Sequence, residues 1–170
     1  MLLYIILSVV LLLLATWAVY FFLYENKLKW IQSEIIQLFL SRTNSIIWLY
    51  EVTHPYLEKH AEVFEEILAL RKKEFNLHEV SNNLEAFLEL EAKIHHEFNF
   101  IYKVCNTHRK IEKEKRYLYM REIILEKSQK IWRKIHDYNT FVSKYNELIR
   151  YKNFSVLWLL LPFRQKKLLK

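Results

Sequence analysis

The stretch His136 to Ile149, HDYNTFVSKYNELI, contains the pair Tyr-Asn twice, as Tyr138-Asn139 and Tyr145-Asn146. The pairs are seven residues apart, which is two helical turns at 3.5 residues per turn, so the tyrosines should share one face. A tyrosine can bury its ring and keep its hydroxyl for a partner. Each asparagine then lies at the edge of this apolar seam. An ordinary heptad core with solvent-facing asparagines is the alternative interpretation.

The same apolar seam continues through most of the chain from Glu25 onward, because apolar residues recur at a spacing near 3.5. In the last helix the seam residues are Tyr117, Ile124, Ile131, Ile135, Tyr138, Val142, Tyr145 and Ile149. Three polar residues also occupy seam positions, namely Glu91, Arg121 and Ser128. The pattern predicts an all-α fold with coiled-coil-like packing of its helices.

Helix boundaries are harder to place, because the chain contains no glycine and only two prolines. Pro55 either kinks a helix or begins a new one. Asn76 is a candidate N-cap for a third helix, with Glu79 three residues on as in a capping box. Residues 106–115 contain neither glycine nor proline, so the sequence leaves open whether the helix is broken there.

The first 24 residues are uncharged and predominantly aliphatic or aromatic. As a helix they would span about 36 Å, against about 30 Å for the hydrocarbon core of a bilayer. No basic residue precedes this segment, which argues against a cleaved signal peptide. We therefore predict a transmembrane helix over residues 1–24, with an aromatic belt near its end formed by Trp17, Tyr20 and Tyr24.

Lys27 and Lys29 follow the predicted span closely. The positive-inside rule then places the N-terminus outside and the rest of the chain in the cytoplasm. At the other end, residues 154–163 read FSVLWLLLPF and precede a basic tail. A segment of ten mostly apolar residues is too short to cross a bilayer, so it either folds back over the bundle or lies in the membrane interface, where Trp158, Lys166 and Lys167 would contact lipid.

Composition excludes several functions. Phosphate-binding loops, nucleophile elbows and tight β-hairpins rely on glycine, which is absent. Residues 25–107 carry a net charge of −4 and residues 108–153 a net charge of +7, which suits pairing of acidic and basic helices within one bundle. The basic residues of the last helix alternate with acidic ones and no DNA-reading motif is present, so we expect no nucleic-acid partner.

Candidate catalytic and metal-binding residues are few. Glu51 and His54 match the Glu-x-x-His element of di-iron bundles, but such sites need a second element and two further glutamates. Cys105 and His108 could supply two zinc ligands, and zinc requires more. We expect no catalytic residue, no cofactor and no metal. Cys105 is the only cysteine and is expected to pack as a small apolar group.

These features together resemble the LemA family of bacterial proteins. Residues 56–71, YLEKHAEVFEEILALR, are similar to that family's Tyr-Ala-x-His-Glu-x-x-Val-Phe-x-x-Val-x-x-Ala-Arg segment, and the doubled Tyr-Asn matches its closing motif. The sequence departs from the family around Arg42, where a proline and an asparagine are missing, and at Pro55, which replaces a glycine. The resemblance implies four antiparallel helices behind an anchor whose N-terminus is outside, and it carries over no catalytic residue.

With the resemblance, the doubled Tyr-Asn is interpreted as a structural element that fixes the last helix, Asn139 and Asn146 bonding to the facing helices. The predicted organisation is an anchor at 1–24, a bundle at 25–153 and an apolar and basic C-terminal segment at 154–170, for which both placements stay open. We expect a non-enzymatic scaffold at the bacterial cytoplasmic membrane, whose partners are the bilayer and either another protein or a second copy. A ligand- or metal-binding sensor subunit, and a bundle on the outer side of the membrane, are the alternatives.

Overall fold

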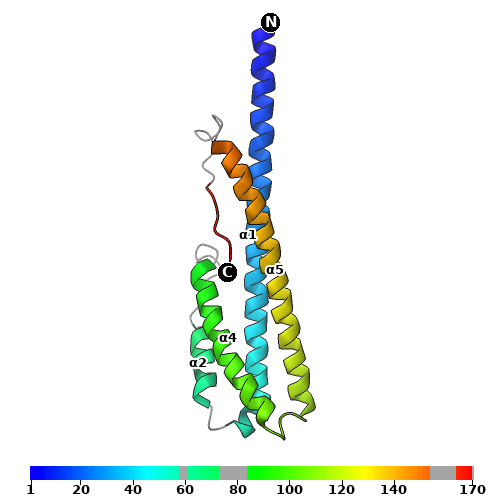
Figure 1. Cartoon of the computed structure of the whole chain (residues 1–170), viewed down its shortest axis with the longest axis vertical. Helices are drawn as coiled ribbons and strands as arrows, with labels where there is room; N and C mark the ends of the chain where they lie inside the picture. The colour runs from blue at the N-terminus through cyan, green and yellow to red at the C-terminus, as the bar shows by residue number, and fades with distance from the viewer. Residues whose placement is uncertain (58–60, 73–83, 154–163, 170) are drawn as a thin grey trace. The chain divides into compact units, whose positions relative to one another are not determined.

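The computed structural model describes residues 1–57, 61–72, 84–153 and 164–169, and within these ranges every regular element is a helix and there is no strand (Figure 1). Helix α1 comprises Leu2–Thr53 and is followed by the 3-10 helix η1, His54–Tyr56. The other described elements are helices α2, Ala61–Lys72, α4, Leu84–Thr107, and α5, Lys115–Asn153. The all-α class and the four helices are confirmed for the described residues.

Helix α1 continues without interruption from the apolar N-terminal segment into the heptad-patterned part of the chain. By length and composition it is the one helix in the described ranges that could cross a membrane. Its most apolar 18-residue window has a mean hydropathy of 2.7, and none of that window is buried. The segment thus presents its apolar side chains outward instead of covering them with other helices.

Pro55 ends α1 and does not kink it. Proline lacks an amide hydrogen and its ring clashes with the carbonyl four residues earlier, so a helix cannot continue normally through it. Here Pro55 lies at the start of η1, where the missing donor costs nothing. The hydroxyl of Thr53 donates to the carbonyl of Leu49 at 2.8 Å, and the turn closes with a bond from the Leu57 amide to the His54 carbonyl.

The chain does break between α4 and α5, although no glycine is available there. The amides of His108 and Glu112 bond to the carbonyls of Cys105 and His108, and no described residue has a positive φ angle. Ile111 in this connection is buried in the core and holds the turn against the helices. The predicted N-cap at Asn76 and its partner Glu79 lie outside the described residues.

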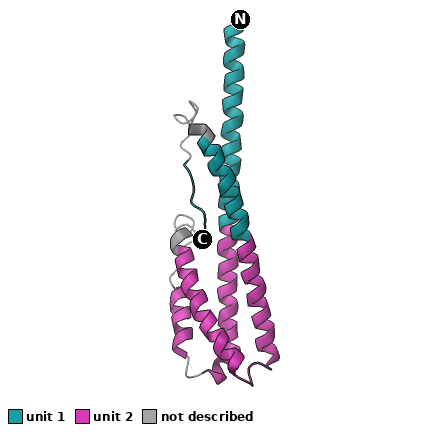
Figure 2. Cartoon of the chain, viewed as in Figure 1, with its two compact units in different colours: residues 1–32, 134–170 teal, residues 33–133 magenta. Residues whose placement is uncertain are grey.

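The described chain separates into two compact units, coloured in Figure 2. Unit 1 contains residues 1–32 and 134–170, and unit 2 contains residues 33–133, so α1 and α5 contribute to both. The division at residues 24 and 153, made from composition, stays a prediction.

Unit 2 is organised around one hydrophobic core to which all four helices contribute. Its buried members are Ile46, Leu49, Leu57, Phe64, Ile67, Ile94, Phe98, Ile101, Cys105, Ile111, Tyr117, Met120 and Ile124. The members in α4 and α5 recur at three- and four-residue steps, as the sequence pattern predicts.

Unit 1 buries a shorter seam between α1 and α5. From α1 the buried residues are Phe21, Leu28 and Ile31, and from α5 they are Ile135, Tyr138, Val142, Tyr145 and Ile149. The α5 residues alternate steps of three and four, which keeps one apolar stripe facing α1. The doubled Tyr-Asn lies on and beside this stripe.

Candidate interaction site on helix α5

Tyr138 and Tyr145 both lie in the buried seam, 2% and 1% exposed, as their seven-residue spacing predicts. The amide of Gln32 in α1 donates a hydrogen bond to the Tyr138 hydroxyl at 2.9 Å. The ring of Tyr145 meets that of Phe21 edge-on, with centroids 6.2 Å apart and planes 85° apart. The two tyrosines therefore fix the rotation of α5 against α1 within unit 1.

Asn139 and Asn146 lie one residue further round α5 and bond to the C-terminal tail, which we define as residues 164–169. The Nδ2 of Asn139 donates to the Leu169 carbonyl at 2.8 Å, and the Leu169 amide donates to the Asn139 Oδ1 at 2.8 Å. Asn146 makes the same two bonds, each 2.8 Å, with Lys166. Each asparagine thus holds both the donor and the acceptor of one tail residue.

The prediction that these asparagines bond to facing helices is therefore wrong. Along a helix the backbone amides are already engaged, so a neighbouring helix offers no free donor to the Oδ1 of an asparagine. An extended residue presents a free amide and a free carbonyl, which match the donor and acceptor of one carboxamide. The tail has no helix or strand and runs alongside α5 in the opposite direction (Figure 1).

One side-chain contact accompanies the four main-chain bonds. The Lys166 ammonium lies 3.4 Å from Oε1 of Glu25 in α1, and both side chains are about a quarter exposed, 26% and 22%. Burial raises the pKa of the nearby Tyr145 to about 12, and the negative charge of Glu25 adds to that shift. The negative charge of Glu25 also favours a cation at position 166 of the tail.

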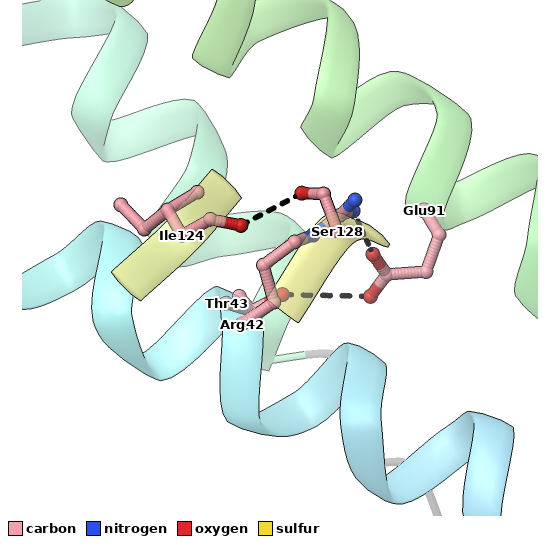
Figure 3. A network of polar contacts seen from close by, with 5 residues as sticks. All are labelled: Arg42, Thr43, Glu91, Ile124 and Ser128. Carbon is pink, nitrogen blue, oxygen red and sulfur yellow. Dashed lines mark hydrogen bonds and ion pairs between the residues drawn. The ribbon is translucent and has the colours of Figure 1, made fainter. Parts of the chain in front are cut away.

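Unit 2 contains a second polar group, a buried ion pair between α1 and α4 (Figure 3). Arg42 Nη2 lies 2.8 Å from Glu91 Oε2, and the side chains are 6% and 3% exposed. The Thr43 hydroxyl donates to the other carboxylate oxygen at 3.5 Å. The Nε of Arg42 is buried without an acceptor in the described part of the chain.

Burial dominates the electrostatics of this pair. It raises the pKa of Glu91 and lowers that of Arg42, while the attraction between the two charges opposes both shifts only in part. In buried ion pairs generally, the cost of desolvation can exceed the Coulomb attraction between the charges. The role of this pair is to fix how α1 meets α4 in unit 2.

Of the three polar seam residues predicted, Glu91 is fully buried, whereas Arg121 and Ser128 are half-buried. Ser128 lies beside the ion pair in Figure 3 and satisfies its hydroxyl within α5, on the Ile124 carbonyl at 2.9 Å. Sequence reasoning missed Arg42 as the partner of Glu91. The signal was available, because Arg42 continues the three- and four-residue steps of the buried α1 residues Ile35, Phe39, Ile46 and Leu49.

Lys127 supplies a further polar link between α5 and α1 in unit 2. Its ammonium donates to the Ser41 carbonyl at 2.9 Å and to the Ser45 hydroxyl at 2.7 Å. The Ser45 hydroxyl in turn donates to the Ser41 carbonyl at 3.1 Å. These contacts use a carbonyl that already belongs to a helix, through its second lone pair.

The residues predicted to meet the membrane interface belong to α1 and to the C-terminal part of unit 1. Tyr20, Lys27 and Lys29 are exposed, and Trp17 and Tyr24 are half-buried. The Lys27 ammonium lies 4.1 Å from the centre of the Trp30 ring. In the tail, Lys167 is exposed and Lys166 is half-buried, while Trp158 lies outside the described residues. Contact of these residues with lipid stays a prediction.

The two candidate metal-binding motifs, Glu51 with His54 and Cys105 with His108, do not form a metal site among the described residues. Glu51 and His54 are exposed at the end of α1 and in η1. Burial raises the pKa of the Cys105 thiol to about 12, which keeps it protonated, while His108 is half-buried. Among the residues that the structure describes, no three His, Cys, Asp or Glu side chains gather closely enough to hold a metal ion.

These observations define a class: an all-α protein with one long apolar N-terminal helix, four described helices and polar groups that join them. Residues 32–170 match the model of the LemA family, which is most of the chain. The chain belongs to the LemA family, and the resemblance seen in its sequence is confirmed. No curated protein and no solved structure matches it.

Proposed function

We propose that this protein is a single-pass, membrane-anchored scaffold that acts by binding other proteins and catalyses no reaction. The observation that carries the proposal is the continuity of α1, whose exposed apolar half leads directly into a half that packs in a helical core. An uncovered apolar helix of this length is unfavourable in water and suited to a bilayer.

The proposed architecture is an antiparallel four-helix bundle behind the anchor. Contacts within unit 1 support it, because Phe21 meets Tyr145 whereas Gln32, further along α1, meets the earlier residue Tyr138. That order is the one expected of helices running in opposite directions. A connection of few residues between α4 and α5 is also typical of antiparallel neighbours.

The proposal of binding without catalysis is supported by how polar groups are used. Arg42 and Glu91 bond to each other, and Tyr138 bonds to Gln32, so these buried groups stabilise helix contacts. The Cys105 thiol, with its raised pKa, is a poor nucleophile for the same reason of burial.

The proposed location is a bacterial cytoplasmic membrane, with the N-terminus outside and the bundle in the cytoplasm. Lys27 and Lys29 follow the uncharged segment and support this orientation through the positive-inside rule. The basic tail then faces the same side, where anionic headgroups of the inner leaflet attract cations.

Labelling of single cysteines with a membrane-impermeant maleimide tests both the anchor and the orientation. In a Cys105→Ser background, Lys110→Cys places an exposed thiol in the connection between α4 and α5, and Leu2→Cys places one at the N-terminus. In intact bacterial cells we expect labelling at residue 2, with residue 110 labelled only after lysis. Labelling of residue 110 but not of residue 2 in intact cells would place the bundle outside. Labelling of both sites, or release of the protein by alkaline carbonate, would refute the anchor.

A further inference from the structure

The two asparagines of α5 form a repeated device. Asn139 and Asn146 each hold one residue of the C-terminal tail through both its amide and its carbonyl, and all four bonds measure 2.8 Å. We call this pair the asparagine ladder. Every bond goes to main-chain atoms, so the ladder does not depend on which side chains stand at tail positions 166 and 169.

The spacing of the ladder fits an extended chain. Seven residues of α-helix advance about 10.5 Å, and three residues of an extended chain advance about 10 Å. Asn139 and Asn146 are seven residues apart, and their partners Leu169 and Lys166 are three apart. A helix carrying asparagine at this interval can therefore hold any extended segment that has free amides at two positions three residues apart.

Two neighbouring features make the ladder a built site. Tyr138 and Tyr145, each one residue before an asparagine, are buried against α1 and fix the direction in which the asparagines point. Glu25 lies opposite Lys166 at 3.4 Å and favours a basic residue at the first of the two tail positions. The site thus combines sequence-independent main-chain recognition with one charge preference.

We propose that the asparagine ladder is a peptide-binding site, that the chain's own tail is its resident ligand, and that an extended basic peptide of a partner protein binds when the tail is displaced. The tail acts as an autoinhibitory segment. This inference rests on the proposed role as a binding scaffold and names the surface that would bind. The recognised chemistry is an unmodified amide at two positions three residues apart, with lysine or arginine at the first.

The test uses the protein in detergent micelles, with a fluorescein-labelled peptide of residues 164–170, RQKKLLK, as the probe. Fluorescence anisotropy is measured with the full chain and with a chain ending at residue 163. We expect the shortened chain to bind the peptide at least about 10-fold more tightly, because a tethered tail competes at an effective concentration in about the millimolar range. Equal affinity for both proteins would overturn the autoinhibitory role, and absence of binding to both would overturn the site.

Variants of the shortened chain identify the site. Asn139→Ala/Asn146→Ala should weaken peptide binding at least about 30-fold, since four hydrogen bonds are lost. Thr140→Ala/Glu147→Gln is the matched control, because these exposed residues of α5 are also seven apart. Helix content by circular dichroism is compared for all variants. An effect of the control pair as large as that of the asparagine pair would contradict the assignment.

Variants of the peptide test main-chain recognition directly. N-methylation of the amides at Lys166 and Leu169 removes the two donors and leaves every side chain in place, and it should abolish binding. N-methylation at Gln165 and Leu168, which are also three apart and pair with neither asparagine, should have little effect. Loss of binding with both peptides alike would show that the ladder does not read these two amides.

Amide hydrogen exchange in the full chain supplies a test that needs no truncation. The amides of Lys166 and Leu169 should exchange at least about 10-fold more slowly than those of Gln165 and Leu168, and the Asn139→Ala/Asn146→Ala change should remove the difference. Equal exchange in the unaltered chain would overturn the proposal. These measurements do not depend on membrane orientation, so the topology experiment and the peptide experiment can fail separately.

Discussion

Replacing Arg42 by methionine is expected to lower the free energy of unfolding by about 3–5 kcal/mol, the usual cost of removing one partner of a buried ion pair. The pair is well suited to this test, because its atoms are 2.8 Å apart and its side chains are only 6% and 3% exposed. Glu91→Leu should cost a similar amount, since it leaves the guanidinium buried without a counter-charge. The free energy of unfolding of most domains is only about 5–15 kcal/mol. The loss caused by either single substitution should therefore be easy to measure.

The double variant Arg42→Met/Glu91→Leu should differ from the unaltered chain by less than about 1 kcal/mol, or be more stable, because both desolvation costs disappear together. The unpartnered Nε of Arg42 adds to the cost that is removed. The single variant Arg42→Met should also be less destabilised at about pH 5 than at about pH 8, because a carboxyl group that is protonated is cheaper to bury.

Urea unfolding of the full chain in a mild detergent, followed by far-UV circular dichroism, measures these free energies. The matched control is Glu126→Gln, which removes an ion pair to Lys130 of 2.6 Å whose side chains are 55% and 60% exposed. That change should leave the unfolding midpoint where it was, because exposed pairs contribute little. Single changes in the buried pair that cost under about 1 kcal/mol, or a double variant as unstable as the sum of the singles, would refute the reasoning.

Three further predictions concern individual side chains. Tyr138→Phe should lower the free energy of unfolding by about 1 kcal/mol in the same urea assay, because Gln32 loses its acceptor. Burial raises the pKa of Tyr145 from 10.0 to about 12, so its contribution to stability should be complete below pH 10 and lost as the pH rises through 12. An unfolding series against pH should show a drop there that Tyr145→Phe makes smaller, since other buried groups such as Cys105 titrate in the same range. Maleimide should label Cys105 only after denaturation, because the thiol is buried and its pKa is about 12; rapid labelling of the folded chain, detected by mass spectrometry, would contradict its burial.

Much of the fold follows from periodicity alone. The seven-residue spacing of Tyr138 and Tyr145 predicts two buried tyrosines on one face, and both are buried. Glu91 stands at an apolar position in an otherwise regular seam, and it is indeed in the core. Such predictions succeed because a helix fixes which residues share a face before any tertiary contact is known.

The hydrogen-bond partners of the polar residues could not be predicted from periodicity. The sequence shows that Asn139 lies at the edge of a seam but not that Leu169, thirty residues later, bonds to it. The tail has no periodic pattern, and its bonds use backbone atoms that every residue has. The sequence left two outcomes open at Pro55 for a different reason. A proline disrupts a helix either by kinking it or by ending it, and the sequence does not decide between these.

The asparagine ladder requires a fixed number of residues between its bonded positions. The side chain at 169 is free to vary as long as its amide remains, whereas Glu25 favours a cation at 166. Proline is excluded at both positions because it has no amide hydrogen. A single inserted residue between Asn139 and Asn146 would turn one of them by about 100° around α5. One inserted between Lys166 and Leu169 would shift the tail by about 3.3 Å against the helix. Across related sequences the two intervals, seven residues in α5 and three in the tail, should therefore be conserved even where the residues between them differ.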